Sequence, residues 1–411
     1  MTTTKNNEHK KLNFSSEREQ SQVCLNSAEH EKNQGRKVLN VPNLRFPEFR
    51  GEWEEHLLGN ISDVTKLAGF EFTKYVTYED TGSIIAIRGL NCKNGSLDLR
   101  DVKYIDNSDF SKLSRSKLYV GDILYTYVGT VGEVAVVDKN DKYYLAPNVS
   151  RIRLSKDYNS DFIKQLLGSK KFYNKIVFPL IATSSQPALS MENLRRFKLR
   201  VPSIKEQKKI ASLFNAIDEH IATQNKIIDK LQSLIKGIAQ NIVRNNKPNV
   251  RISDCLECNS STLQESDVCE HGTYPVYGAN GIVGYLKNYN TEGEAVYIIK
   301  DGSGVGTVSY VTGKCSATGT LNTLQAKEGY SLHYLYYLLK VFNFEPYKTG
   351  MAIPHIYFKD YGKAKFFCPS YTEQLRYARL LSAIDNKLSI EQNILTGLTL
   401  QKQCLLRQMF I

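Results

Sequence analysis

A segment of about 40 residues that occurs twice constrains the fold more than any other feature of the sequence. One copy covers residues 202–243 and the other residues 369–410, with one constant offset (369 − 202 = 167). Residues shared at this offset include Glu206, Gln207, Ala216, Ile217 and Asp218, which match Glu373, Gln374, Ala383, Ile384 and Asp385. A repeat of this length implies that two copies of one structural element organise the chain.

Both copies are predicted to be long helices. Ser203 and Ser370 stand at N-cap positions, and Glu206 and Glu373 follow three residues later to complete a capping box. Apolar residues then recur at spacings of three and four, which places them on one face. About 40 helical residues span ~60 Å, which is more than an ordinary globular domain requires. We therefore expect two spacer helices that pack on each other.

The apolar stripe defines the expected contact between the helices. Both copies contain two four-residue steps in succession, and such a stutter locally unwinds a coiled coil. Gln224 and Glu391 also occupy the stripe, and they either specify the register as buried polar groups or face solvent. The apolar residues on the stripe are Ile210, Leu213, Ile217, Ile221, Ile228 and Leu231 in the first copy and Leu380, Ile384, Leu388, Leu395 and Leu398 in the second.

Composition restricts the class of protein. The 411 residues suffice for about three domains, carry a formal net charge of +12 and include 25 Tyr. Basic and aromatic residues together favour a polyanionic partner, most often a nucleic acid, although many basic proteins bind none. The eight cysteines lack a paired spacing and indicate reduced thiols in a cytoplasmic protein. No apolar run reaches the ~18 residues of a membrane span, and the polar N-terminus is not a secretory signal.

The chain divides into five segments that alternate between globule and helix. In the first globule, residues 57–64 predict a short helix and residues 83–149 predict a series of strands. The segments are a polar tail expected to be disordered over residues 1–40, a globule over 41–202, a long helix over 203–246, a second globule over 247–369 and a second long helix over 370–411.

The second globule repeats the skeleton of the first. Residues 250–254 resemble residues 59–63 (254 − 63 = 191), and residues 353–356 take the place of residues 186–189. Because the first helix leads from one globule to the other, a second helix packed on it must run back. The sequence therefore predicts an α+β protein in which two mixed α/β globules are separated by two long antiparallel coiled-coil helices, with a pseudo-twofold internal repeat.

Duplex DNA is a ligand that suits such a pseudo-twofold arrangement. Two reading domains on a rigid spacer fix a half-site separation, as they do in dimeric repressors. With ~3.4 Å per base-pair step and a spacer of ~60 Å, the two half-site centres should lie within about 18 base pairs of each other.

The motifs of DNA-modifying enzymes are missing from the sequence. Residues 302–307 follow a predicted strand but fail the pattern G-x-G-x-x-G, because Thr307 stands at the third glycine position, so we expect a hairpin turn there. No Asn/Asp-Pro-Pro-Tyr run, which adenine methyltransferases use to hold a flipped base, occurs in the chain. The sequence favours a non-catalytic DNA reader that carries no cofactor.

One group of cysteines resembles half a zinc site. Cys255 and Cys258 are followed by Cys269 and His271. The repeat argues against zinc, because the offset of 191 places Cys255 and Cys258 on apolar core positions of the first globule. We expect small buried thiols and no metal.

Candidates for DNA contacts are polar side chains on loops near basic surface. Arg and Lys suit guanine, whereas Asn and Gln suit adenine. For any one of them, a phosphate contact or an ordinary solvated side chain explains the residue equally well. The first globule offers Arg88, Asn91, Lys93, Tyr127, Arg151, Ser184, Ser185 and Gln186, and the second offers Tyr277, Asn280, Lys300, Asp301, Lys314 and His355.

Taken together, these features resemble the specificity (S) subunit of type I restriction-modification systems. The resemblance covers about residues 41–411 and rests on the doubled layout, the P-S-x-x-E-Q helix starts, the segment IIAIRGLNCKNGSLDL, and YPVYGANGIVGYLKNYN with IKDGSGVGTV. It implies two target-recognition domains that each read half of a split site in double-stranded DNA. It also implies partner methyltransferase (M) subunits, two in number, that carry S-adenosylmethionine, and restriction (R) subunits that use ATP and Mg.

Two rival hypotheses stay open at this point. One is a coiled-coil interaction scaffold whose globules bind a protein or a glycan. The other is a stand-alone DNA-modifying enzyme, which would show activity as a purified chain. A steep salt dependence of binding would favour DNA over a protein or glycan ligand.

Overall fold

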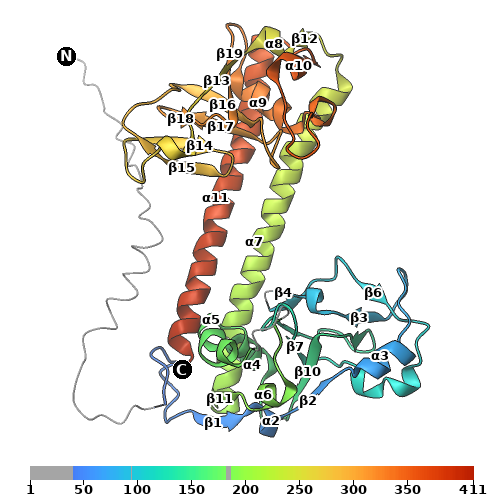
Figure 1. Cartoon of the computed structure of the whole chain (residues 1–411). Coiled ribbons are helices and arrows are strands. Elements are labelled where there is room, and N and C mark those ends of the chain that lie inside the picture. The colour runs from blue at the N-terminus through green and yellow to red at the C-terminus, as the bar shows by residue number, and fades with distance from the viewer. Residues whose placement is uncertain (1–39, 94, 182–186) are drawn as a thin grey trace, which may run out of the picture. The chain divides into compact units, whose positions relative to one another are not determined.

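The computed structural model describes residues 40–93, 95–181 and 187–411. The chain forms two compact units (Figure 1). Among the described residues, unit 1 comprises those up to residue 220 and residues 397–411, and unit 2 comprises residues 221–396. The division falls inside the two long helices, α7 (Ile204–Asn245) and α11 (Tyr371–Met409). Each unit therefore contains part of both helices, so the compact units differ from the five predicted segments.

Unit 1 is built around a four-stranded antiparallel sheet. A three-stranded sheet accompanies it, in which β3 and β9 run parallel. The larger sheet has the order β2-β10-β7-β8 (Ser62–Lys66, Val149–Leu154, Ile123–Thr126, Val134–Val136), and the smaller has the order β6-β3-β9 (Lys103–Tyr104, Ile85–Ile87, Tyr143–Leu145). The remaining strands form two pairs, β1 with β11 (Glu54–Leu57, Lys198–Val201) and β4 with β5 (Cys92–Lys93, Ser96–Leu97). The α-helices of this globule are α2 (Leu58–Ile61), α3 (Gly69–Tyr75), α4 (Ser160–Leu167), α5 (Lys170–Phe172) and α6 (Met191–Arg195).

Unit 2 repeats the strand order of both sheets of unit 1, whereas the β4–β5 pair has no counterpart among its described strands. Its larger sheet has the order β13-β19-β16-β17 (Leu256–Ser260, Leu321–Ala326, Glu294–Ile299, Val308–Thr312), and its smaller sheet has the order β15-β14-β18 (Gly281–Leu286, Tyr274–Gly278, Ser316–Ala317). Strands β14 and β18 run parallel, as β3 and β9 do in unit 1. The other elements are β12 paired with β20 (Val250–Arg251, Lys365–Phe366), α8 (Ile252–Cys255), α9 (Leu332–Val341) and α10 (Phe358–Tyr361). The internal repeat predicted from the sequence is thus present in the strand order.

The structure corrects the predicted short helix at residues 57–64. Helix α2 ends at Ile61 and strand β2 begins at Ser62, because the β-branched Val64 and Thr65 pair with β10 in the sheet. In unit 2, α8 is followed in the same way by β13 at Leu256. Strands β2 and β13 are therefore related by an offset of 194 (256 − 62), and the offset of 191 was wrong.

Both long helices begin where their capping signals predict. The Ser203 hydroxyl accepts a hydrogen bond from the backbone N of Glu206 at 3.5 Å, and the Ser370 hydroxyl donates to the Glu373 carboxylate at 2.9 Å. The helices have 42 and 39 residues, which confirms the prediction of two long helices. Within the described residues, no helix combines the length and apolar character needed to cross a membrane.

The repeated glutamine ties each long helix to a short helix of the same unit. In unit 1, the Gln207 side chain accepts a hydrogen bond from the backbone N of Asn159, the N-cap of α4, at 2.9 Å. In unit 2, Gln374 accepts the equivalent bond from Ser331, the N-cap of α9, also at 2.9 Å. Each glutamine also donates to the carbonyl of its own helix-start proline. The repeat therefore includes the contact between each long helix and a short helix as well as the long helix itself.

The repeated aspartate makes a second contact of the same kind. Asp218 accepts a hydrogen bond from the Gln165 amide of α4 at 2.8 Å. Asp385 accepts one from the Tyr337 hydroxyl of α9 at 3.4 Å. The two donors occupy equivalent positions in their helices, so one carboxylate position holds different donors in the two units.

Each unit buries both faces of its larger sheet. In unit 1, one face packs against Trp53, Phe162 and Phe410, and the ring centroid of Trp53 lies 5.7 Å from that of Phe162 and 6.2 Å from that of Phe410. The other face contributes Leu124 to a second cluster, together with residues of the smaller sheet. In unit 2, Tyr297 of β16 belongs to a second core cluster in the same way as Leu124 of β7 does in unit 1. Burial of both faces explains why these strands read as continuous apolar runs.

The predicted apolar stripe on the helices is largely buried, with one correction. Ile210, Ile217, Ile228 and Leu388 are buried, and Leu213, Ile221, Leu231, Ile384, Leu395 and Leu398 are half-buried. Leu380 is 51% exposed, whereas the next residue, Leu381, is fully buried. Leu381 matches Phe214 of the first copy, and both side chains belong to the core of their unit. The stripe therefore passes through residue 381 because the helix also packs on the core of its unit there.

Candidate nucleic-acid interface

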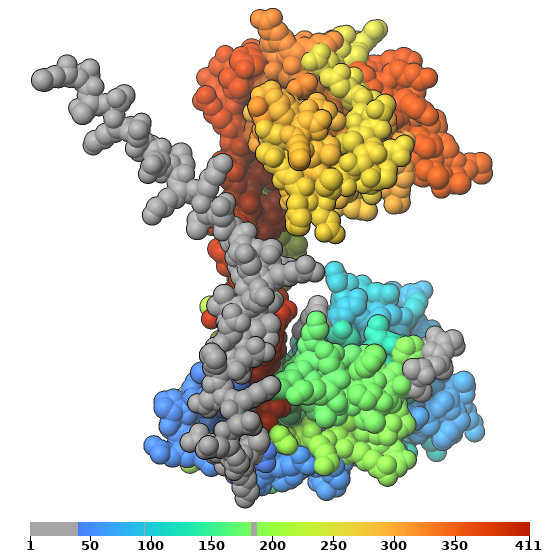
Figure 2. All heavy atoms as spheres, turned by 60° about the vertical axis from the view of Figure 1, so that its left-hand side comes forward, coloured from blue at the N-terminus to red at the C-terminus, as the bar shows by residue number. Residues whose placement is uncertain are grey.

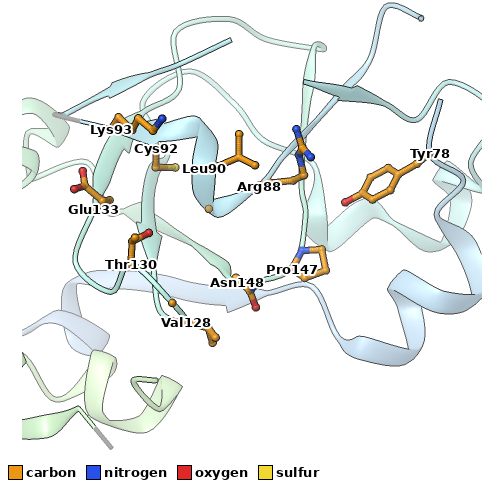
Figure 3. A pocket seen from close by; sticks show the side chains of 12 residues that line it. Tyr78, Arg88, Leu90, Cys92, Lys93, Val128, Thr130, Glu133, Pro147 and Asn148 are labelled. Atoms are coloured by element: carbon orange, nitrogen blue, oxygen red, sulfur yellow. The ribbon is translucent and has the colours of Figure 1, made fainter. Parts of the chain in front are cut away.

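A cavity of about 630 Å³ opens on unit 1 and brings predicted residues together. One wall is the 3-10 turn Gly89–Asn91 with its neighbours Arg88 and Lys93, and the other is the loop after β7. Figure 3 shows the side chains that surround this space. In the space-filling view, the cyan-to-green segments of unit 1 lie together on one face (Figure 2). The walls offer cationic, amide, hydroxyl and apolar groups, which is the mixture that base edges require.

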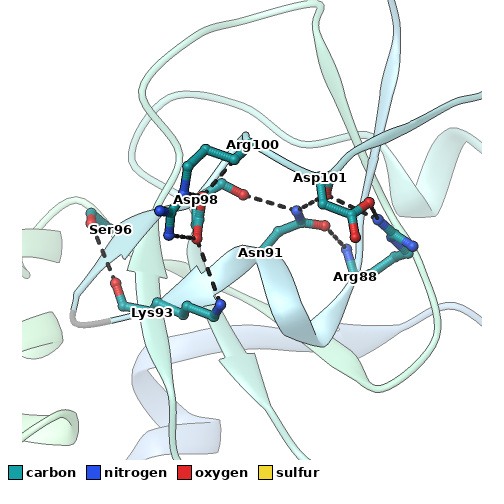
Figure 4. Close-up of polar contacts among 7 residues, drawn as sticks. All are labelled: Arg88, Asn91, Lys93, Ser96, Asp98, Arg100 and Asp101. Carbon is teal, nitrogen blue, oxygen red and sulfur yellow. Dashed lines mark hydrogen bonds and ion pairs between the residues drawn. The ribbon is translucent and has the colours of Figure 1, made fainter. Parts of the chain in front are cut away.

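Asn91 is a structural residue of the 3-10 turn. It is fully buried, its side-chain O accepts a hydrogen bond from the Arg88 backbone N at 3.0 Å, and its amide N donates to the carbonyls of Asp98 and Asp101 at 2.9 and 2.7 Å (Figure 4). All its hydrogen-bonding capacity points inward, so the prediction that Asn91 contacts DNA is corrected. Arg88 is half-buried, and its guanidinium bonds the Asp101 carboxylate at 2.7 Å.

Lys93 lies on the rim of the cavity. Its side chain is exposed, and its ammonium lies 3.6 Å from the Asp98 carboxylate. Asp98 is bonded more tightly by Arg100, at 2.7 Å, and this guanidinium holds the pKa of the carboxyl below its ordinary value. Two cations thus accompany the Asp98 carboxylate, which stays ionised at neutral pH, and Glu133 adds a second acidic side chain to the lining of the cavity.

Arg151 belongs to the sheet and not to the surface. It is 4% exposed in strand β10, with its guanidinium bonded to the Asp63 carboxylate and, at 3.0 Å, to the carbonyl of Arg115. Burial lowers its pKa. The prediction that Arg151 contacts DNA is therefore corrected, because β10 is a central strand flanked by β2 and β7.

The loop after β7 is held to residues 187–189 by two backbone hydrogen bonds. The backbone N of Gly129 donates to the carbonyl of Pro187 at 2.9 Å, and the N of Leu189 donates to the carbonyl of Tyr127 at 2.8 Å. Tyr127 is half-buried, and burial raises the pKa of its phenol. The predicted contacts Ser184, Ser185 and Gln186 lie outside the described residues.

Unit 2 contains the same two backbone hydrogen bonds. The N of Gly302 donates to the carbonyl of Pro354 at 3.0 Å, and the N of Ile356 donates to the carbonyl of half-buried Lys300 at 2.9 Å. This confirms that residues 353–356 occupy the place of the segment ending at residue 189. It also confirms the hairpin expected at residues 302–307, since β16 and β17 pair antiparallel on either side of it.

The side chains at this junction differ between the units. In unit 1, the bridge between the two segments joins Val128 and Ala188. In unit 2, the bridge joins Asp301 and His355, and the imidazole Nδ1 lies 2.7 Å from the carboxylate O. Both side chains are about one-third exposed. The same backbone geometry thus presents an apolar pair in one unit and an oriented imidazole in the other.

Three further predicted residues of unit 2 lie in or near its smaller sheet. Tyr277 is half-buried, and burial raises the pKa of its phenol. Asn280 is exposed in the turn between β14 and β15. Lys314 is exposed, and its ammonium lies 4.7 Å from the centre of the Tyr289 ring and 3.6 Å from the Glu292 carboxylate. Asn280 and Lys314 are available to a ligand, whereas Tyr277 is mainly a packing residue.

Several surface residues near these sites were not predicted from the sequence. Leu90 and Asn148 are exposed at the cavity of unit 1, and Asn148 has a φ of +74°. Met351 and Ile353 are exposed near His355 in unit 2. The Pro-Asn pair at residues 147–148 was a usable turn signal, but apolar residues gave none, because a hydrophobic residue in a sequence is normally assigned to a core.

The three cysteines considered for a zinc site have different environments. Cys255 is buried, and burial raises the pKa of half-buried Cys258 to about 11. Cys269 is exposed. In the part of the chain that the structure describes, no three His, Cys, Asp or Glu side chains are grouped closely enough to hold a metal ion. With the offset of 194, Cys258 corresponds to Val64 of β2.

Comparison with known proteins identifies the family. The model of the type I restriction modification DNA specificity domain matches residues 51–233 and 245–400, which is more than half of the chain. A protein carrying the name of the MjaX specificity subunit, from Methanocaldococcus jannaschii, is 22% identical over 222 residues, which is 50% of this chain and 49% of that protein. The EcoKI specificity subunit of Escherichia coli K12 is 24% identical over 164 residues, or 38% of this chain and 35% of that protein. The chain thus spans about half or less of the length of these relatives.

A solved structure supports the fold independently. The S subunit of a type I restriction-modification system from M. genitalium matches with a TM-score of 0.63 at 17% identity, covering 90% of this chain and 99% of that one. Its likeness to this chain extends over both units. The chain therefore belongs to the type I restriction modification DNA specificity domain family.

Proposed function

We propose that this chain reads a bipartite sequence in double-stranded DNA without itself acting on the DNA. The observation that carries the proposal is one strand framework built twice, with Val128 and Ala188 at a junction in unit 1 and Asp301 and His355 at the same junction in unit 2. A shared framework with different exposed groups is what two readers of different half-sites require. The net charge of +12 supplies attraction to phosphates.

The two long helices serve as the spacer in this proposal. In unit 1, the Lys402 ammonium is paired with the Asp218 carboxylate, and in unit 2 the Gln224 amide donates to the carbonyl of Glu391 at 3.0 Å. A later residue of α7 meets an earlier residue of α11, which supports an antiparallel coiled coil. The proposed target-recognition domains are residues 41–202 and 247–369, and the spacer helices are residues 203–246 and 370–411.

Partner subunits complete the proposed assembly. The relatives are named as specificity subunits of type I restriction enzymes, so we assign catalysis to M subunits, two in number, that carry S-adenosylmethionine, and to R subunits that use ATP and Mg. This chain would position them in the cytoplasm over the DNA it has bound. Correct half-sites at the correct spacing then select the adenines to be methylated.

Binding of the purified chain to duplex DNA tests the proposal. The duplex would contain the motif found by mapping methylated adenines in cells that produce the chain and its partners. We expect the association constant to fall on the order of 10³-fold between 50 and 200 mM salt, because bound phosphates release counterions. Binding that ignores both salt and sequence would instead support a protein or glycan ligand, and methyl transfer by the chain alone would support an enzyme.

His355→Ala should weaken recognition of one half-site. The imidazole is oriented by Asp301 and partly exposed, so we expect the dissociation constant for the full site to rise by about 5- to 150-fold, the effect of ~1–3 kcal/mol for one contact. Fluorescence anisotropy with single-base variants of each half-site measures it. His220→Ala, which removes an exposed imidazole from α7, is the matched control. Equal loss for both half-sites would contradict a local role.

A further inference from the structure

The strongest unexplained feature is a polar pair inside the apolar seam of the two long helices. Gln224 is 8% exposed and Glu391 is 5% exposed. The Gln224 amide N donates to the backbone carbonyl of Glu391 at 3.0 Å and to its carboxylate, and Lys387 pairs with the same carboxylate. The alternative that these residues face solvent is therefore wrong.

The two residues are equivalent positions of the repeat, since 391 − 224 = 167. Equivalent positions can meet only where a local twofold axis relates the two helix copies. Two identical residues there would be either two amides or two carboxylates, and two buried carboxylates would repel each other. The chain instead has a donor opposite an acceptor, so the copies have diverged at the point where they face each other.

The surroundings explain what this pair can specify. Ile228 and Leu388 are buried in the same cluster, and Leu231, Ile384 and Leu395 pack against it. Aliphatic side chains at heptad spacing tolerate a shift of one heptad. A shift would place the Glu391 carboxylate opposite an aliphatic side chain without its amide donor. Lys387 belongs to the same helix and would stay beside the carboxylate, so the shift loses a hydrogen bond to a charged group, which is unfavourable in a buried place.

We propose that Gln224 and Glu391 set the register of α7 against α11. This goes beyond the proposed function, because it concerns the packing of the helices with no DNA bound. Within unit 2, the pair selects one alignment from several that the aliphatic residues of the seam would allow, and the packing of Phe410 on Phe214 in unit 1 favours the same alignment. If the helices are the spacer, the same pair determines the separation of the half-sites.

Distance measurements on the full-length chain test the register. Spin labels on unnatural amino acids at exposed positions 222 and 379, which are separated mainly along the helix axes, would be measured by double electron–electron resonance. The wild type and Glu391→Gln, which keeps an amide acceptor, should show one distance. Gln224→Leu with Glu391→Leu should add a population displaced by about 10 Å, the length of one heptad. A single unchanged distance in the double leucine variant would overturn the proposal.

Thermal unfolding of the same variants provides the second readout. Gln224→Leu alone should lower the midpoint, because Glu391 loses its donor. Adding Glu391→Leu should raise the midpoint above that of the wild type by about 2–4 °C, since an apolar pair of similar size often stabilises a core. An unchanged midpoint in the single variant would also overturn the proposal. Neither readout uses DNA, so a failure of DNA recognition would count against the proposed function only.

Discussion

Replacing residues 250–368 with the corresponding segment of a relative should change one half of the recognised DNA site and leave the other half unchanged. The segment holds β12 to β20, which complete both sheets of unit 2. Discrimination at ~1–3 kcal/mol per base pair would make the exchanged half-site differ by orders of magnitude in affinity. Mapping of methylated adenines in cells carrying the chimaera and its partners measures the outcome.

The boundary of the exchanged segment, where Asn249 meets residue 368, is suited to the test. Asn249 donates through its amide to the carbonyl of Cys368 and accepts from the backbone N of the same residue, both at 2.8 Å. Because both bonds go to backbone atoms, any residue at position 368 except proline can make them. The half-site assigned to unit 1 is the internal control. A change in both halves would contradict the assignment of one half-site to each unit.

Phe410→Ala should destabilise unit 1 by about 3–5 kcal/mol, the usual effect of truncating a buried aromatic side chain. Phe410 is 2% exposed, and its ring centroid lies 5.1 Å from that of Phe162 and 5.8 Å from that of Phe214. The side chain fills the centre of the core, so its loss leaves a cavity that neighbouring rings can close only in part.

The single tryptophan makes this prediction measurable. Trp53 lies in the same core, with its ring centroid 6.2 Å from that of Phe410, so its fluorescence during urea unfolding reports on unit 1. Phe70→Ala is the matched control, because Phe70 is 67% exposed and surface substitutions usually stay within about 0.5 kcal/mol. Equal effects of the two substitutions would show that residue 410 is not part of the folded core.

Local signals predicted the elements whose hydrogen bonds are local. The capping serines and the periodic apolar residues located α7 and α11, because a helix bonds to itself within four residues. The segment at residues 57–64 misled the prediction for the opposite reason. Its Val64 and Thr65 bond to β10, nearly 90 residues later, and no local pattern reveals that partner.

The candidate site could be predicted only in part, for the same reason. Residue type and loop position led to Arg88, Lys93, Asn280, Lys314 and His355, which the structure leaves at least partly exposed. The same reasoning failed for Asn91 and Arg151, because the exposure of a polar side chain depends on which distant segments pack around it.

The sequence by itself determined that the chain contains two copies of one long capped helix and two related globules, since identity at a constant offset and helical periodicity are properties of neighbouring residues. Only the tertiary structure decided that Gln224 meets Glu391, that Gln207 and Gln374 accept hydrogen bonds from the N-cap residues of short helices, and that Asp301 orients His355. Each of these contacts joins residues from separate parts of the chain, and hydrogen-bond geometry in space, which sequence spacing does not encode, selects the partners.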